Sequence, residues 1–132
     1  MYKRDFNFGK EQELVLLPRL NEFFKDNLKP TPDRYTKYDF EGDTCIYELK
    51  SRTCKFEQYP TTLFPADKVE GIRNEKPQVF IFHFTNGTYY INYDVNVFKD
   101  IEVASFRRFR IGVRDKEKAY FHIPTTLLKK IF

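Results

Sequence analysis

The segment Lys37-Tyr-Asp-Phe-Glu-Gly-Asp-Thr-Cys-Ile-Tyr-Glu-Leu-Lys50 reads as two short strands joined by a turn. Aromatic and β-branched residues on both sides of Gly42-Asp43 favour extended structure, and the Gly-Asp pair favours a tight turn. Because alternate residues of a strand share a face of the sheet, this hairpin predicts that Asp39, Glu48 and Lys50 lie on one face. The opposite face is predicted to belong to the core. The tight turn also predicts the register, which pairs Glu41 with Thr44, Phe40 with Cys45, Asp39 with Ile46 and Tyr38 with Tyr47.

The three charged residues indicate the chemistry of phosphodiester hydrolysis. In this register Asp39 and Glu48 are diagonal neighbours, about 7–8 Å apart, and their carboxylates can converge on one cation. Mg²⁺ prefers such oxygen ligands, polarises a phosphoryl oxygen and lowers the pKa of a bound water. Lys50 can orient or deprotonate that water and stabilise the charge of the transition state. The same alternation is also typical of a hairpin whose charged face is solvated, so both interpretations stay open.

Residues 9–24 predict an amphipathic helix, because large apolar side chains recur there at three- and four-residue spacing. Glu13 falls on this apolar stripe or at its edge, four residues before Leu17, where an acid needs a partner or a cation. It is therefore a candidate for the catalytic site, with a surface pair to a lysine as the alternative. Pro18 predicts that the helix is kinked or split.

Taken together, these motifs resemble the PD-(D/E)XK nuclease superfamily: a helix carrying Gly9-x-x-x-Glu13, then a strand with Asp39, then a strand with Glu48-Leu49-Lys50. The resemblance implies an α/β, restriction-endonuclease-like fold with a mixed central β-sheet flanked by α-helices. It implies that Asp39, Glu48 and the Leu49 carbonyl hold Mg²⁺ or Mn²⁺, that Lys50 acts on the attacking water, and that Glu13 supports the metal site.

The chain departs from the family pattern at two points. Tyr38 stands where a proline would precede the aspartate, and only a tight turn separates Asp39 from Glu48. The family includes restriction endonucleases, Holliday-junction resolvases and small phage and viral nucleases. Its small members often pair to cut two strands, so the resemblance favours an endonuclease that acts on DNA and forms a homodimer.

Length and composition predict one nuclease-like domain over residues 1–132. A chain of 132 residues with 41% hydrophobic content can bury one core but not two ordinary ones. The net charge, 23 − 19 = +4, permits nucleic-acid binding without requiring it. No apolar run is long enough to span a bilayer, the first residues do not read as a signal peptide, and two cysteines are too few for a disulfide framework. We therefore expect a cytoplasmic protein in a reducing compartment, with no membrane partner.

The remaining segments predict further elements without a domain boundary. In order along the chain they are a loop over 27–36, an irregular polar segment over 52–64, a short helix from Pro65 to about Arg73, a strand over 78–85 covered on both faces, a turn at Asn86-Gly87, a strand over 88–93, a strand pair formed by 103–113 and 119–123, and a last short helix from Pro124. His83 is expected in the core or at an edge of its hairpin, and His122 has no acid or nucleophile nearby in sequence.

Basic residues in three places are candidates for binding the phosphate backbone of DNA. They are Arg52 and Lys55 after the catalytic lysine, Lys68 and Arg73 on the predicted middle helix, and Arg107, Arg108, Arg110 and Arg114 on a predicted strand. The alternative is that these charges are solvated. Two other functions stay open: a non-catalytic nucleic-acid-binding module, which needs a basic groove without a metal pocket, and an interaction protein with a fully open acidic hairpin.

Overall fold

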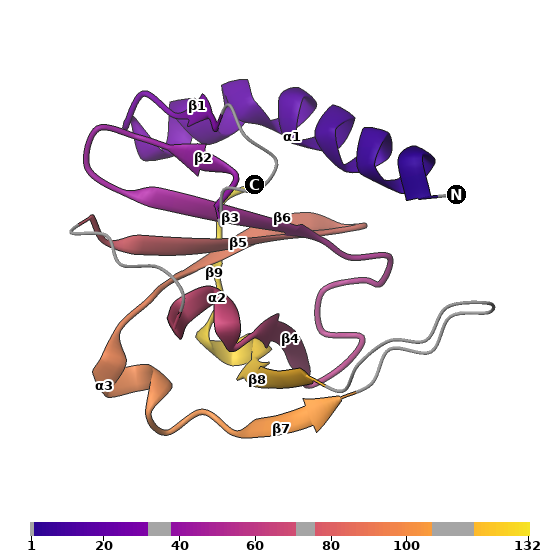
Figure 1. Cartoon of the computed structure of the whole chain (residues 1–132), viewed down its shortest axis with the longest axis vertical. Helices are drawn as coiled ribbons and strands as arrows, with labels where there is room; N and C mark the ends of the chain where they lie inside the picture. The colour runs from indigo at the N-terminus through magenta and orange to yellow at the C-terminus, as the bar shows by residue number, and fades with distance from the viewer. Residues whose placement is uncertain (1, 32–37, 71–75, 107–117) are drawn as a thin grey trace.

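The computed structural model describes residues 2–31, 38–70, 76–106 and 118–132 of the 132-residue chain. Within these ranges the fold is α/β, with one long helix and two sheets (Figure 1). The elements are α1 (Tyr2–Phe24), β1 (Lys29–Pro30), β2 (Phe40–Glu41), β3 (Ile46–Ser51), β4 (Thr61–Pro65), α2 (Asp67–Glu70), β5 (Gln78–Phe84), β6 (Gly87–Asn92), α3 (Val95–Phe98), β7 (Val103–Phe106), β8 (Lys118–Pro124), a 3₁₀ turn (Thr125–Leu127) and β9 (Lys129–Lys130).

The larger sheet is mixed and has the strand order β1-β2-β3-β5-β6-β9. Neighbouring strands are antiparallel except β3 and β5, which are parallel, with Glu48 opposite Phe80 and Lys50 opposite Phe82. A parallel pair needs a long crossover connection, and here that connection contains β4 and α2. The chain therefore leaves β3, enters a second sheet and returns to the first as β5.

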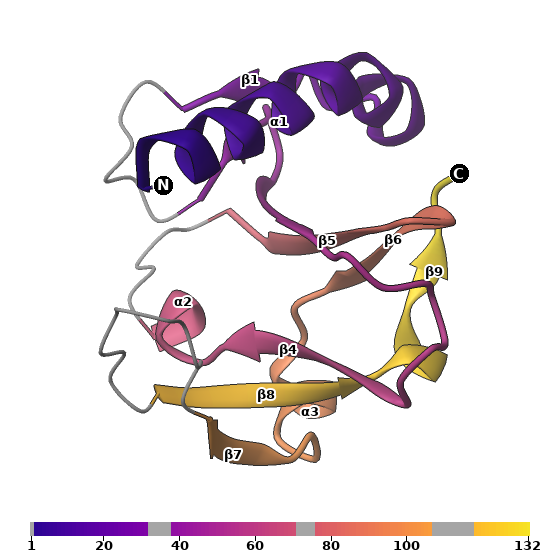
Figure 2. The same cartoon turned by 90° about the vertical axis from the view of Figure 1, so that its right-hand side faces the viewer.

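Helix α1 covers one face of the larger sheet (Figures 1 and 2). Its buried residues Leu16 and Leu20 recur at four-residue spacing and pack with Tyr47 and Leu49 of β3 in one hydrophobic cluster. This cluster also contains Leu28, Phe40, Val79 and Ile81. The helix begins at Tyr2, seven residues before the predicted start, and continues through Pro18, so Pro18 does not split it. Because Pro18 is exposed, its ring does not disturb the buried stripe.

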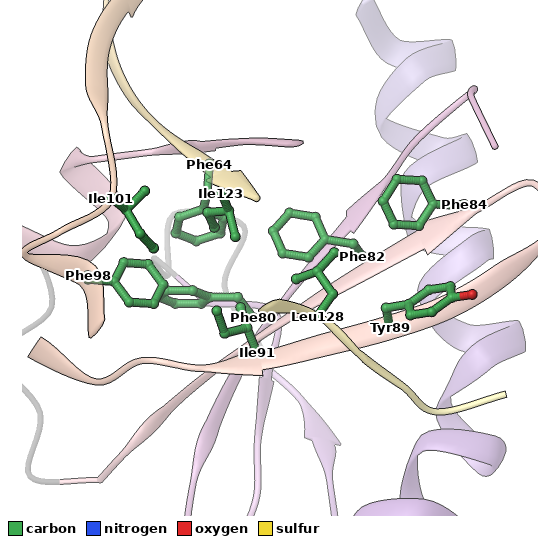
Figure 3. Packing of buried hydrophobic residues seen from close by; sticks show 10 residues of the cluster. All are labelled: Phe64, Phe80, Phe82, Phe84, Tyr89, Ile91, Phe98, Ile101, Ile123 and Leu128. Atoms are coloured by element: carbon green, nitrogen blue, oxygen red, sulfur yellow. The ribbon is translucent and has the colours of Figure 1, made fainter. Parts of the chain in front are cut away.

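The opposite face of the larger sheet packs on a second, three-stranded antiparallel sheet with the order β4-β8-β7 (Figure 2). Between the sheets lies an aromatic core in which the rings of Phe64 and Phe80 stack with centroids 4.0 Å apart (Figure 3). Phe82 and Ile123 belong to the same core and are fully buried. The prediction that the strand at 78–85 is covered on both faces is confirmed, because odd residues of β5 face α1 and even residues face the second sheet.

The structure confirms an α/β fold with a mixed sheet, and the long helix α1 covers only one face of that sheet. The other face packs on the second sheet, with Phe98 of α3 and Val69 of α2 in the same core. Pro65 ends β4 instead of opening the predicted middle helix, whose described part is α2, Asp67–Glu70. The predicted last helix is also wrong, since the chain after Pro124 makes one 3₁₀ turn and then β9.

Smaller differences concern loops and turns. The segment predicted as a loop over 27–36 contains β1, which pairs with β2. In the β5–β6 hairpin Phe84 pairs with Gly87, so Thr85 and Asn86 form the turn, one residue earlier than predicted. The predicted strand pair near the end of the chain is present as β7 and β8, with Phe106 opposite Lys118.

Candidate metal and catalytic site at strand β3

The loop between β2 and β3 is longer than the predicted tight turn. Phe40 pairs with Tyr47 and Glu41 pairs with Ile46, so residues 42–45 form the connection and the predicted register is wrong by two residues. A shift of two keeps every side chain on its predicted face, since strand side chains alternate with a period of two. The buried side chain of Asp26 explains the longer loop, because it accepts hydrogen bonds from the backbone N–H groups of Thr44 and Cys45, at 2.8 and 3.0 Å.

Asp39 lies in the bend just before β2, and its carboxylate reaches β3. Asp39 Oδ2 accepts a 2.7 Å hydrogen bond from the backbone N–H of Leu49. The backbone of Asp39 is fixed as well, because its N–H donates to the carbonyl of Tyr47 and its carbonyl accepts from the N–H of Thr31. The structure thus places the Asp39 carboxylate beside the peptide bond that joins Glu48 to Leu49.

The Leu49 carbonyl faces the same edge of β3 as Asp39. The N–H groups of Ile46 and Arg52 donate to carbonyls of the β5 side, Pro77 and His83. Even-numbered N–H groups of β3 therefore point toward β5, and odd-numbered ones point toward the β2 side. Since the N–H and the carbonyl of one strand residue point to the same edge, the Leu49 carbonyl is directed toward the β2 side, as its predicted role requires.

Glu48 and Lys50 form an ion pair on the face of β3 opposite α1. Lys50 Nζ lies 3.3 Å from Glu48 Oε1, and the two side chains are 27% and 6% exposed. The charged face of the hairpin is therefore not fully solvated: Glu48 and Ile46 are buried, and Phe80, opposite Glu48 on β5, belongs to the inter-sheet core. A buried carboxylate requires a charged partner, and Lys50 supplies one while its own side chain still reaches solvent.

Glu13 is half-buried on α1, one turn before Leu16. The helix runs antiparallel to β3, so its N-terminal half lies toward the end where β3 finishes (Figure 1). Glu48 and Lys50 project from the other face of the strand, because Tyr47 and Leu49 face the helix. Glu13 therefore belongs to the helix on the face of the sheet opposite the ion pair, and its predicted support of the metal site stays a prediction.

The oxygen ligands at β3 suit Mg²⁺ or Mn²⁺. Among the described residues, no three or more His, Cys, Asp or Glu side chains gather closely enough to hold a metal ion by themselves. Mg²⁺ does not need such a group, since it commonly takes one or two carboxylates and completes its shell with water and substrate phosphate. The Asp39 and Glu48 carboxylates and the Leu49 carbonyl are hard oxygen ligands of the required kind.

The predicted DNA-binding residues have different surroundings. Arg52, the residue after β3, is half-buried and hydrogen-bonds to β4. Its Nε donates to Thr62 Oγ1 at 3.2 Å, and its Nη2 donates to the Leu63 carbonyl. Lys55 is exposed in the loop that follows β3. Lys68 belongs to α2, and its side chain lies outside the described part of the structure. The other predicted phosphate ligands, Arg73, Arg107, Arg108, Arg110 and Arg114, lie outside the described residues.

Both histidines lie outside the Glu48–Lys50 ion pair. His83 is half-buried in β5, as predicted, and its Nδ1 lies 2.7 Å from Thr88 Oγ1. Burial lowers the pKa of His83, and the nearby positive charge of Arg19 lowers it further, so the imidazole is neutral at physiological pH. His122 lies in β8, in the second sheet, and its backbone N–H donates to the carbonyl of Glu102.

Sequence reasoning missed Asp26, whose carboxylate shapes the loop next to the site. The residue follows α1 in Lys25-Asp26-Asn27, a polar segment that is typical of an exposed turn, and both neighbours adopt positive φ angles of 52°. Its partners lie 18 to 21 residues further along the chain. No local pattern indicates such long-range contacts, so this role could not be found from the sequence.

Comparison with known proteins leaves the family open: no family model matches the chain, and no curated protein or solved structure matches it. Within the described residues, no helix has the length and apolar character that crossing a membrane requires.

Proposed function

We propose that this protein is a Mg²⁺- or Mn²⁺-dependent nuclease that hydrolyses phosphodiester bonds in DNA, on a restriction-endonuclease-like fold. The observation that supports this most is that the Asp39 carboxylate bonds to the backbone of β3, the strand that carries Glu48 and Lys50. The Asp39 carboxylate is held at the Leu49 N–H, next in the chain to a buried glutamate paired with a lysine. A buried carboxylate such as that of Glu48 is costly for folding, and such costs are concentrated at functional sites.

Residues of this chain can supply all of the protein ligands of the metal ion. The carboxylates of Asp39 and Glu48, with the Leu49 carbonyl, would hold the metal ion. When bound, such an ion supplies Lewis-acid polarisation of a phosphoryl oxygen. Two carboxylates leave most of the coordination shell for water and for the substrate.

Lys50 contributes a positive charge next to these ligands. Of the ion pair with Glu48, the lysine is the more exposed member, with 27% of its side chain accessible against 6% for the acid. Its ammonium group is therefore the part of the pair that a substrate phosphate can approach. There it orients the attacking water and stabilises the negative charge that develops on the phosphoryl oxygens.

The test is cleavage of supercoiled plasmid, linear duplex and single-stranded oligonucleotides with Mg²⁺, Mn²⁺ or EDTA. Wild-type protein is expected to cut at least one substrate with a metal ion and none with EDTA. Lys50→Ala is expected to lose about 100-fold or more in rate, which is typical for removal of a group that acts in the chemical step. The matched control is Lys99→Ala, which removes the same charge from an exposed position after α3 and should cut normally.

Two results would show that the proposal is wrong. One is a Lys50→Ala variant that cuts at the wild-type rate. The other is a wild-type protein that binds DNA but cuts no substrate with either metal ion, which would favour the non-catalytic binding module.

A further inference from the structure

We propose that Asp26 is a positioning residue for the β3 site: its carboxylate fixes the loop 42–45 and thereby sets the register that brings Asp39 to the Leu49 N–H. The inference rests on the proposed function for its catalytic meaning, whereas its structural content can be tested separately. Asp26 lies outside the motifs of the site, thirteen residues before Asp39 in the chain, and the short strand β1 lies between them.

Asp26 is 6% exposed, and both of its carboxylate oxygens are used. Oδ1 accepts from the N–H and the hydroxyl of Thr44, at 2.8 and 2.7 Å, and Oδ2 accepts from the N–H of Cys45 at 3.0 Å and the hydroxyl of Tyr47 at 2.7 Å. The carbonyl of Asp26 also accepts a 2.9 Å bond from the N–H of Asp43. One residue thus binds three consecutive loop residues and the second residue of β3.

Gly42 packs directly against Asp26. A Cβ atom added at Gly42 would lie 2.6 Å from both Cγ and the carbonyl oxygen of Asp26 and would clash with Oδ2. The backbone of Gly42 is buried, and its N–H donates to the Cys45 carbonyl at 2.8 Å. Asp26 and Gly42 therefore fit together as one unit that closes the β2–β3 connection.

The register depends on this unit. A two-residue turn at Gly42-Asp43 satisfies the same hydrophobic pattern, because a shift of two residues moves no side chain to the other face. That register would displace β2 along β3 by about 6.6 Å, which is two residues at about 3.3 Å each. The Asp39 carboxylate would then lie too far along the strand to accept from the Leu49 N–H. The bonds to Asp26 favour the longer loop and exclude this alternative.

The decisive measurement is the NMR signal of the Leu49 amide. An N–H that donates to a carboxylate is shifted downfield while the carboxylate is ionised, and Asp39→Asn identifies that shift in the spectrum. In Asp26→Asn an NH2 donor replaces one of the two acceptor oxygens, so the backbone N–H of either Thr44 or Cys45 loses its acceptor. We expect the downfield shift of Leu49 to be lost and the Mn²⁺ dissociation constant to rise at least tenfold.

Asp94→Ala is the matched control. It removes the capping bond from the Asn96 N–H to Asp94 at α3, far from the loop in the chain, and lowers stability without touching Asp26. This variant should keep both the Leu49 shift and the Mn²⁺ affinity. If Asp26→Asn does not fold, Tyr47→Phe, which deletes one of the donors to Asp26 and keeps the ring, should still speed hydrogen exchange at the Leu49 amide.

The outcomes separate the two proposals. An unchanged Leu49 shift in folded Asp26→Asn, or unchanged Leu49 exchange in Tyr47→Phe, overturns the positioning role of Asp26. Loss of the shift in a protein that neither binds Mn²⁺ nor cuts DNA in its wild-type form supports the positioning of Asp39 while it refutes the nuclease function.

Discussion

The carboxylate of Asp39 accepts a hydrogen bond from the backbone N–H of Leu49, with Oδ2 and N 2.7 Å apart. This bond connects the bend before β2 to the third strand of the six-stranded sheet, one residue before the strand pair of Phe40 with Tyr47. It also places an acidic oxygen beside the backbone of Glu48, whose side chain pairs with Lys50. The acid thus serves the fold and, in the proposed site, the metal ion.

Asp39→Asn separates these two roles. The amide oxygen of asparagine can still accept from the Leu49 N–H, so the free energy of unfolding should fall by less than about 1 kcal/mol. Loss of the charge should weaken Mn²⁺ binding at least tenfold, measured by calorimetry. Asp39→Ala should lose both functions and be destabilised by about 1–3 kcal/mol, because the Leu49 donor loses its partner. Equal Mn²⁺ affinity in wild type and Asp39→Asn would contradict the shared metal site.

The Glu48–Lys50 pair should be no more stabilising than two apolar side chains in its place, although activity requires the pair. Lys50→Ala leaves a buried carboxylate without this partner and should lower the free energy of unfolding by up to about 3 kcal/mol, the lower end for fully buried pairs, because Lys50 is partly exposed. The double variant Glu48→Leu, Lys50→Met replaces the pair by apolar groups and should be at least as stable as wild type but inactive. Urea unfolding of the three proteins is the measurement. A double variant less stable than Lys50→Ala would show that the pair is mainly structural.

The inter-sheet core predicts a large effect at Phe64. Its ring is fully buried and stacks on Phe80, so Phe64→Ala should lower the free energy of unfolding by about 3–5 kcal/mol. Tyr59, in the preceding loop, is 58% exposed, and Tyr59→Ala should change stability by less than about 0.5 kcal/mol. Similar urea midpoints for both variants would mean that the second sheet does not pack on the first as described.

Hydrophobic alternation predicted much of the larger sheet. It identified β3 and the shared face of Glu48 and Lys50, while a nearly continuous apolar run identified the doubly covered strand β5 and the Asn86-Gly87 pair identified its hairpin with β6. It could not distinguish two registers of β2 that differ by two residues, because both place the same side chains on the same face. The choice between them depends on Asp26, whose contacts are long-range in sequence.

The second sheet shows another limit of local patterns. Residues 52–64 and Pro65 gave no clear strand signal, since polar residues and prolines are rare in strand interiors. The structure tolerates Pro65 at the last position of β4, where it pairs with Tyr120 of β8. Partners that lie more than fifty residues away decide this strand, and a single sequence does not reveal them. The arginines predicted on the strand over 103–113 lie beyond β7, outside the described residues, and their role stays a prediction.

Gly42 should tolerate no side chain. The Cβ of Gly42→Ala would lie 2.6 Å from the Asp26 carbonyl oxygen, which is backbone and cannot move aside cheaply, so we expect a loss of about 2 kcal/mol or more. The control is Gly87→Ala in the β5–β6 hairpin, where the nearest atom to the new Cβ is Tyr89 Cε2, at 3.1 Å, in a side chain that can adjust. Thermal unfolding should show a much larger drop for Gly42→Ala. Equal melting temperatures would mean that Asp26 and Gly42 are not closely packed.

The Asp26 carboxylate should make stability depend on pH in acid. Burial alone raises the pKa of Asp26, but hydrogen bonds from Tyr47, from Thr44 and from the Cys45 N–H outweigh it, so the pKa in the folded protein is below its ordinary value. A carboxyl group of this kind binds fewer protons in the folded than in the unfolded state. Its contribution is therefore complete above the unfolded pKa of about 3.9 and is lost as the pH falls through the folded pKa.

The measurement is the difference in free energy of unfolding between wild type and Asp26→Asn, from urea titrations over the acid range. We expect this difference to be constant above about pH 5 and to shrink below about pH 4. In that acid range the unfolded wild-type chain binds a proton at Asp26 that the folded protein does not bind, whereas the asparagine of the variant binds no proton in either state. Tyr47→Phe removes one hydrogen bond to the carboxylate and should show a weaker pH dependence than wild type. Parallel pH curves for wild type and Asp26→Asn would mean that the carboxylate is not the hydrogen-bonded anion that closes the loop.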